Sequence, residues 1–129
     1  MELLGHIAKS IIGTGELEAL NWSEFTLVMS FDDDGDVNGT YGYAYLSNGD
    51  WEAFAVDADA VDPSAKAYRE WLTIDGDKGM IKMLFQFNRN TRRVNADFEY
   101  ENPKRWQVTP ANIDKIVEEL RPNLGTPQE

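Results

Sequence analysis

The segments EFTLVMSF (residues 24–31) and TYGYAYL (residues 40–46) decide the fold. In each of them large apolar or aromatic side chains alternate with small or polar ones, and this period of two is typical of a strand with two different faces. Between them lies the acidic, glycine-containing stretch DDDGDVNG, which is typical of a turn. Two alternating strands joined by a short turn predict an antiparallel hairpin.

Three further segments extend this hairpin in both directions along the chain. An Asn-Gly turn at 48–49 precedes WEAFAV (51–56), which predicts a third strand. MIKMLFQFN (80–88) and VNADFEYE (94–101) alternate in the same way and predict a second hairpin. Each strand has one apolar face and one polar face, so we expect an antiparallel sheet with a single covered face.

Three segments have helical periodicity. ELLGHIAKSII (2–12) is the first, and a second is predicted at 63–73, with Asp62 as its N-cap and Pro63 at its first position. A third is predicted with Thr109 as its cap and Pro110 as its opening residue, and it is expected to pack through the stripe from 113 to 120. The predicted fold class is α+β, a single antiparallel sheet of about five strands with helices packed on one face, in the order α-βββ-α-ββ-α. We expect one domain over residues 1–121 and a flexible tail over 122–129.

The charge of the chain restricts its partners. It has 23 acidic and 12 basic residues, a formal net charge of −11, and no cysteine. Direct binding to nucleic acid or to an anionic membrane is therefore disfavoured, because both need a cationic surface. No stretch approaches the roughly 18 apolar residues of a membrane span, and Glu2 and the short apolar runs near the start are unlike a signal peptide. We expect a cytoplasmic protein.

The stretch DGDVNGTYGYAY (34–45) resembles part of a calcium loop. Asp34, Asp36 and Asn38 alternate as the ligands of such a loop do, but Tyr45 stands where the bidentate glutamate is required. Both flanking segments have the period of strands, whereas a calcium loop of this kind lies between helices. We therefore predict an anionic turn without a metal or other cofactor, and expect Asp34 and Asp36 to face a partner.

Recognisable catalytic motifs are missing from the sequence. His6 is the only histidine, and we expect it to be partly buried and hydrogen-bonded rather than a catalytic base. The glycine-rich phosphate loops, zinc-protease motif and nucleophile elbow of known enzymes do not occur. We predict no catalytic residue. The alternative is a small acidic enzyme that uses carboxylates, with a divalent metal at residues 32–36.

A row of carboxylates is expected on the last strand. Asp97, Glu99 and Glu101 are two residues apart, which places them on one face about 6–7 Å from each other. The row is either a solvated outer face or a surface offered to a basic partner. The only local group of basic residues is Arg89, Arg92 and Arg93, in the turn before this strand. We interpret it as a charged hairpin turn, with a phosphate site as the weaker alternative.

The segment MIKMLFQFNRNTRRVNADFEYENPKRW (80–106) resembles the YezG-like immunity proteins. The shared pattern is an apolar strand, a short polar turn, and a strand that ends in alternating acidic and aromatic residues. The resemblance implies a small acidic bacterial antitoxin, not an enzyme, that binds and neutralises a cognate protein toxin, often a nuclease. An acidic inhibitor would be attracted to the basic active site of a nuclease.

A few aromatic side chains are expected to provide most of the affinity for such a partner. The candidates are Tyr41, Tyr43, Trp51 and Trp106, although the tyrosines fit a core position equally well. A general protein-interaction domain with another partner is a further alternative. We expect a monomer or, through an edge strand, a weak homodimer.

Overall fold

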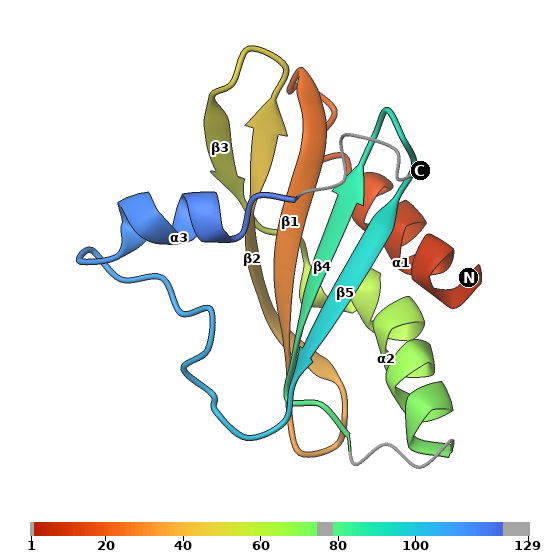
Figure 1. The fold of residues 1–129 in the computed structure, drawn as a ribbon. Coiled ribbons are helices and arrows are strands. Elements are labelled where there is room, and N and C mark those ends of the chain that lie inside the picture. The colour runs from red at the N-terminus through yellow and green to blue at the C-terminus, as the bar shows by residue number, and fades with distance from the viewer. Residues whose placement is uncertain (1, 75–78, 123–129) are drawn as a thin grey trace, which may run out of the picture.

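The computed structural model describes residues 2–74 and 79–122, and it has the predicted α+β class and element order (Figure 1). One antiparallel sheet of five strands forms the centre of the molecule. The elements are α1 (Glu2–Ile12), β1 (Trp22–Phe31), β2 (Val37–Leu46), β3 (Trp51–Phe54), α2 (Ala58–Ile74), β4 (Lys82–Asn88), β5 (Val94–Glu99) and α3 (Ile113–Glu119). All of the predicted tail over 122–129 except its first residue lies outside the described residues.

The strand order is β3-β2-β1-β4-β5, so the first strand of the opening hairpin is the middle of the sheet. Leu27 of β1 lies opposite Gly42 of β2 on one side and Phe85 of β4 on the other. The two strands of the opening hairpin approach very closely at Gly42. A Cβ atom there would lie 2.0 Å from the carbonyl oxygen of Thr26, so only glycine fits.

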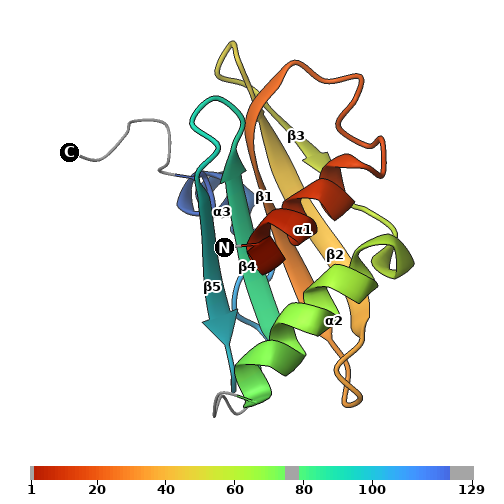
Figure 2. The same ribbon diagram turned by 90° about the vertical axis from the view of Figure 1, so that its right-hand side faces the viewer.

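One face of the sheet, which we call the α1/α2 face, is covered by two helices that lie side by side across the strands (Figure 2). Its core contains Phe25, Leu27 and Phe85 from the sheet together with Ile7 and Ile11 from α1, all fully buried. The helices are joined by a hydrogen bond between the hydroxyl groups of Ser10 and Ser64, 2.9 Å apart. This face confirms the apolar faces predicted for β1, β4 and β5, whereas the large side chains predicted for β2, its tyrosines, lie on the opposite face of the sheet.

The opposite face, which we call the α3 face, corrects the prediction that the helices pack on one face only. Helix α3 and the chain that leads to it lie across this second face (Figure 1). Val28 and Leu84 of the sheet are buried there against Ile116 and Val117 of α3. The prediction was wrong on this point because the α3 face includes polar residues, such as Gln86, that are typical of a solvated surface.

The starts of two helices also differ from the prediction. Helix α2 begins at Ala58, because Asp57 caps it by accepting a hydrogen bond of 3.0 Å from the Asp59 amide. Asp62, the predicted cap, instead accepts a hydrogen bond of 2.8 Å from the amide of Val37 in β2. Pro63 therefore lies inside the helix.

Helix α3 begins at Ile113, after Asn112, so the prediction of Thr109 as its cap and Pro110 as its opening residue was wrong. The side-chain oxygen of Asn112 accepts a hydrogen bond of 2.7 Å from the Thr109 amide, and this contact closes a turn before the helix. The helix consequently has only about two turns. None of the helices in the described part of the chain has both the length and the apolar character needed to cross a membrane.

Candidate functional site

The α3 face is held together by hydrogen bonds from the sheet to the backbone of α3. The Tyr45 hydroxyl donates to the carbonyl oxygen of Val117 at 2.6 Å, and the Gln86 amide donates to the carbonyl oxygen of Leu120 at 2.9 Å. The guanidinium of Arg121 lies 4.5 Å from the centre of the Tyr45 ring. Burial is the main cause of the raised pKa of the Tyr45 hydroxyl. These contacts place α3 across the centre of the sheet.

The segment before α3 is fixed to the same face through Trp106. The Tyr41 hydroxyl donates a hydrogen bond to the carbonyl oxygen of Trp106. The backbone of Trp106 has a positive φ angle of 64°. The guanidinium of Arg105 lies 4.2 Å from the centre of the Trp106 ring. Burial, followed by the charge of Tyr43, raises the pKa of Tyr41 to about 12. Trp106 and Tyr41 are both half-buried, so each presents only part of its ring.

A groove of about 550 Å³ remains open between this segment and the outer strands β2 and β3. Its apolar lining includes Tyr41, Tyr43, Ala53, Val108 and Ile113. Its size is typical of a site for a ligand or a few inserted side chains. We call it the β3 groove.

Trp51 is the exposed aromatic residue next to the lining of this groove. Its side chain is 38% exposed, and its ring meets the Tyr43 ring edge-to-face with 5.3 Å between centres. Tyr43 is only 3% exposed and thus belongs to the core. For Tyr43 the core alternative is therefore correct, whereas Trp51 is available to a partner.

The predicted row of carboxylates is only partly present. Asp97 is exposed on β5, but Glu99 is turned into a compact local network. Its carboxylate accepts hydrogen bonds from the amides of Asn102 and Glu101 and forms an ion pair of 3.0 Å with Arg105. These contacts lower the pKa of Glu99 to about 2, mainly through the two amides. Glu101 follows the end of β5, since the strand stops at Glu99 rather than at 101 as predicted.

Asp34 and Asp36 lie in the turn between β1 and β2, next to α2 and away from the β3 groove. Asp36 forms an ion pair of 2.5 Å with Lys66, whose pKa is raised mainly by this hydrogen bond. Arg69 also packs against the turn, since a Cβ atom on Gly35 would lie 2.6 Å from its guanidinium. The protein's own cations thus offset part of the negative charge that was predicted for a partner.

The same turn brings three carboxylates close together. Asp32, Asp34 and Asp36 each have an oxygen within 4.8 Å of the others. One oxygen of Asp32 accepts hydrogen bonds from the amides of Asp34 and Asp36, at 2.9 and 3.0 Å. These bonds form a tight acidic turn, in agreement with the turn predicted from the sequence.

His6 is exposed on α1 and so differs from the partly buried residue that was predicted. Helix α1 buries the side that contains Ile7 and Ile11, and His6 lies outside that stripe. Sequence reasoning also missed the contribution of Val108 and Ile113 to the β3 groove. Their apolar side chains follow a polar segment, and only the position of α3 brings them to β2.

Comparison of the sequence with models of known protein families gives no match, and comparison with curated proteins gives none either.

Proposed function

We propose that the chain is a non-enzymatic immunity protein of the cytoplasm that binds and neutralises a cognate protein toxin through its α3 face. The observation that carries the proposal is the β3 groove, an open apolar groove with the exposed Trp51 beside it. A partly buried aromatic residue next to an apolar groove is typical of an interface centre, where a few residues contribute most of the binding energy. Most of the aromatic residues predicted to bind a partner lie on this face.

The exposed carboxylates on α3 and on the far edge strand β5 favour a basic partner for the α3 face, although Lys82 places a cation in the lining of the groove itself. Asp114, Glu118 and Glu119 occupy exposed positions on the two-turn helix α3, and Lys115 is its only exposed basic residue. Asp97 adds an exposed carboxylate on β5. With a net charge of −11, the chain attracts a basic nuclease domain over a long range, and this attraction weakens as salt is added.

The proposal is tested by growth rescue and by binding. The chain is co-expressed with a toxin domain encoded by the gene next to its own, and the affinity of the purified pair is measured by calorimetry at two salt concentrations. We expect rescue, and an affinity that falls with salt. Absence of such a toxin gene, or failure to rescue, contradicts the proposal. An affinity insensitive to salt contradicts only the electrostatic part.

Two pairs of variants separate the roles of the surfaces. Trp51→Ala should weaken binding by about 2 kcal/mol or more if Trp51 is a central contact, whereas Trp71→Ala removes an equally exposed tryptophan from α2 and should leave binding unchanged. Asp97→Asn should lower the rate of association with the toxin. Glu70→Gln makes the same change in charge on α2, and it should lower that rate only slightly, through the change in overall charge. If both tryptophan variants bind equally well, the interface lies elsewhere, as in a general interaction domain.

A further inference from the structure

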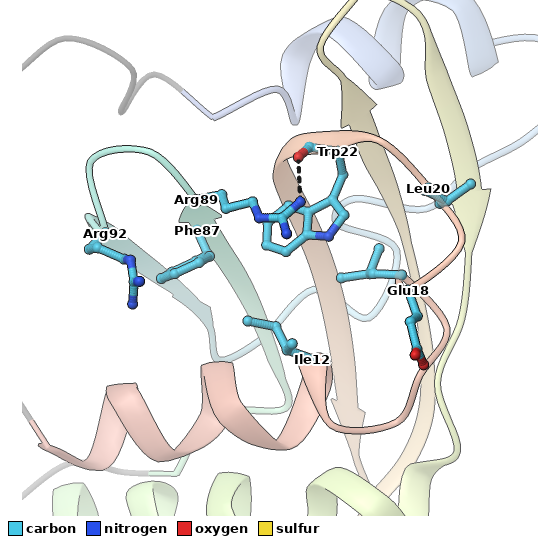
Figure 3. Close-up of a pocket in the computed structure, with 8 residues that line it drawn as sticks. Ile12, Glu18, Leu20, Trp22, Phe87, Arg89 and Arg92 are labelled. Carbon is cyan, nitrogen blue, oxygen red and sulfur yellow. Dashed lines mark hydrogen bonds between the residues drawn. The ribbon is translucent and has the colours of Figure 1, made fainter.

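A second pocket, on the α1/α2 face, lies where the end of α1 meets the hairpin between β4 and β5 (Figure 3). Its volume is about 410 Å³, within the roughly 300–1,000 Å³ of small-molecule sites. The apolar part of its lining comes from Ile12, Leu17, Leu20, Trp22 and Phe87. We call it the α1 pocket.

Arg89 forms one wall of the α1 pocket together with Trp22. Its guanidinium lies 4.8 Å from the centre of the Trp22 ring and donates a hydrogen bond of 3.3 Å to the Trp22 carbonyl oxygen (Figure 3). These two contacts hold the cation over an apolar surface, where an anion is bound more strongly than in open water. They use one of its donor nitrogens, so other donors of the planar fork are available for a ligand.

Arg92 lies on the other side of Phe87 (Figure 3). An adjoining cavity of about 450 Å³ shares Ile12, Phe87 and Arg92 with the α1 pocket and continues along α1 to Lys9. Among the residues that the structure describes, Lys9, Arg89 and Arg92 have no carboxylate partner within 4.0 Å. Three unpaired cations around one apolar site are unexpected in a chain with 23 acidic residues.

The backbone at Arg92 is in a conformation that usually requires glycine. Its φ is 62°, and its amide donates a hydrogen bond of 2.9 Å to the carbonyl oxygen of Asn88, which closes the hairpin turn. A side chain at this position is disfavoured by contact with its own backbone. Arginine is therefore not the residue that the turn itself favours.

We propose that the α1 pocket binds a small amphipathic carboxylate, a molecule with an apolar chain or ring that ends in a single carboxylate. The apolar lining takes the chain, and the guanidinium groups of Arg89 and Arg92 pair with the carboxylate. A singly charged head group fits better than a phosphate. The last residue of α1, Ile12, brings the negative end of the helix dipole to the site, and Glu18 adds a carboxylate to the lining.

This pocket is independent of the proposed toxin inhibition, because it lies on the opposite face of the sheet from the β3 groove. A failure of either proposal leaves the other untouched. The probe for the test is decanoate below its micelle concentration, added to the whole chain labelled with ¹⁵N. We expect saturable shifts of the Trp22 indole signal and of the Arg92 amide signal, with the signals of Trp51 and α3 unchanged.

Two related compounds identify the head group. Decanol has the same chain without the charge and should bind about tenfold more weakly or worse, because it lacks the charge-assisted hydrogen bonds. Decyl phosphate should bind no more tightly than decanoate. Equal binding of decanol overturns the role of the cations, and tighter binding of decyl phosphate overturns the choice of a carboxylate.

Arg92→Gly is the decisive variant, because glycine suits the turn and the variant should fold at least as well as the parent. We expect it to weaken decanoate binding about tenfold or more. Arg89→Lys keeps the charge but removes the planar fork and should also weaken binding. The control is Lys115→Gln on α3, which lowers the net charge by the same amount as Arg92→Gly and should bind normally. Unchanged affinity of Arg92→Gly, or no shift at Trp22 with decanoate, overturns the proposal.

Discussion

The two faces of the sheet are covered in different ways. On the α1/α2 face, two helices of 11 and 17 residues cover a continuous core of large apolar side chains. On the α3 face, a helix of 7 residues covers a smaller core, and hydrogen bonds to its carbonyl groups help to hold it in place. The first face therefore supplies most of the apolar burial, whereas the second leaves room for the β3 groove.

The difference shows how one sheet can serve two purposes. Apolar burial is proportional to area and does not depend on direction, so a broad helical layer gives stability. Hydrogen bonds depend on direction and fix a position with little area. A short helix held by such bonds is precisely placed, and positions on the edge strands, such as Ala53 and Asp97, remain exposed.

The largest expected effect compares two buried leucines, one on each face. Leu27→Ala on the α1/α2 face should lower the free energy of unfolding by about 3–5 kcal/mol, and Leu84→Ala on the α3 face by about 2–3 kcal/mol. The smaller core around Leu84 is covered by a two-turn helix, which can move to fill part of the space. Urea unfolding followed by circular dichroism measures both values. Equal losses would contradict the proposed difference between the faces.

Removal of one hydrogen bond to α3 should have a local effect. Tyr45→Phe leaves the carbonyl group of Val117 without its donor and should cost about 1–2 kcal/mol. Hydrogen exchange should speed up in α3 and stay unchanged in α1. The matched control is Tyr43→Phe, because the Tyr43 hydroxyl makes no hydrogen bond with any residue in the described ranges. If both variants behave alike, the bond does not hold α3 in place.

A buried hydroxyl group on the α3 face predicts a substitution that should raise the stability of the fold instead of lowering it. Thr26 is fully buried, and its hydroxyl has no hydrogen-bond partner among the described residues. Thr26→Val removes this group at nearly constant shape and should stabilise the fold by roughly 1 kcal/mol. The same change at Thr40, whose hydroxyl bonds to the backbone of Val56, should destabilise it. Thermal unfolding of the two variants tests the contrast.

The smallest effect concerns the pH dependence of stability. The pKa of Glu99 in the folded chain, about 2, lies below its ordinary value of 4.5. The ionised Glu99 therefore adds its full contribution to the stability of the fold above about pH 4.5, and this contribution is lost as the pH falls toward 2. Glu99→Gln should therefore flatten the loss of stability across this range. Denaturation at several pH values checks the slope, with Asp97→Asn as the control. A slope equal to that of the parent chain would contradict the assignment.

The α1/α2 face could be predicted from the sequence because its side chains repeat with a period of two or 3.6. Phe25, Leu27 and Phe85 belong to one unbroken alternation, and the stripe of α1 is equally regular. The α+β class and the pairing of strands that are neighbours in the sequence follow from these patterns together with the short turns, whereas the pairing of β1 with β4 does not. The boundaries that failed, such as the start of α2, depended on which aspartate was free to cap the helix.

The α3 face could not be predicted in the same way. Gln86 and Asn88 occupy the polar side of their strand, yet both are buried because their amides find partners on other elements. Local sequence does not reveal such distant partners. The burial of Tyr43 and the hydrogen bonds around Glu99 could not be foreseen for the same reason. Trp51, in contrast, could be named as an exposed candidate.

The hydrogen bonds from Tyr41, Tyr45 and Gln86 all end on carbonyl oxygens of the main chain. Every amino acid has such an oxygen, so these anchors do not depend on which side chains the receiving segment displays. Exposed positions from 106 to 119 can therefore accumulate substitutions while the segment keeps its place on the sheet. Descendants of this chain can in this way change the surface they display without rebuilding their fold.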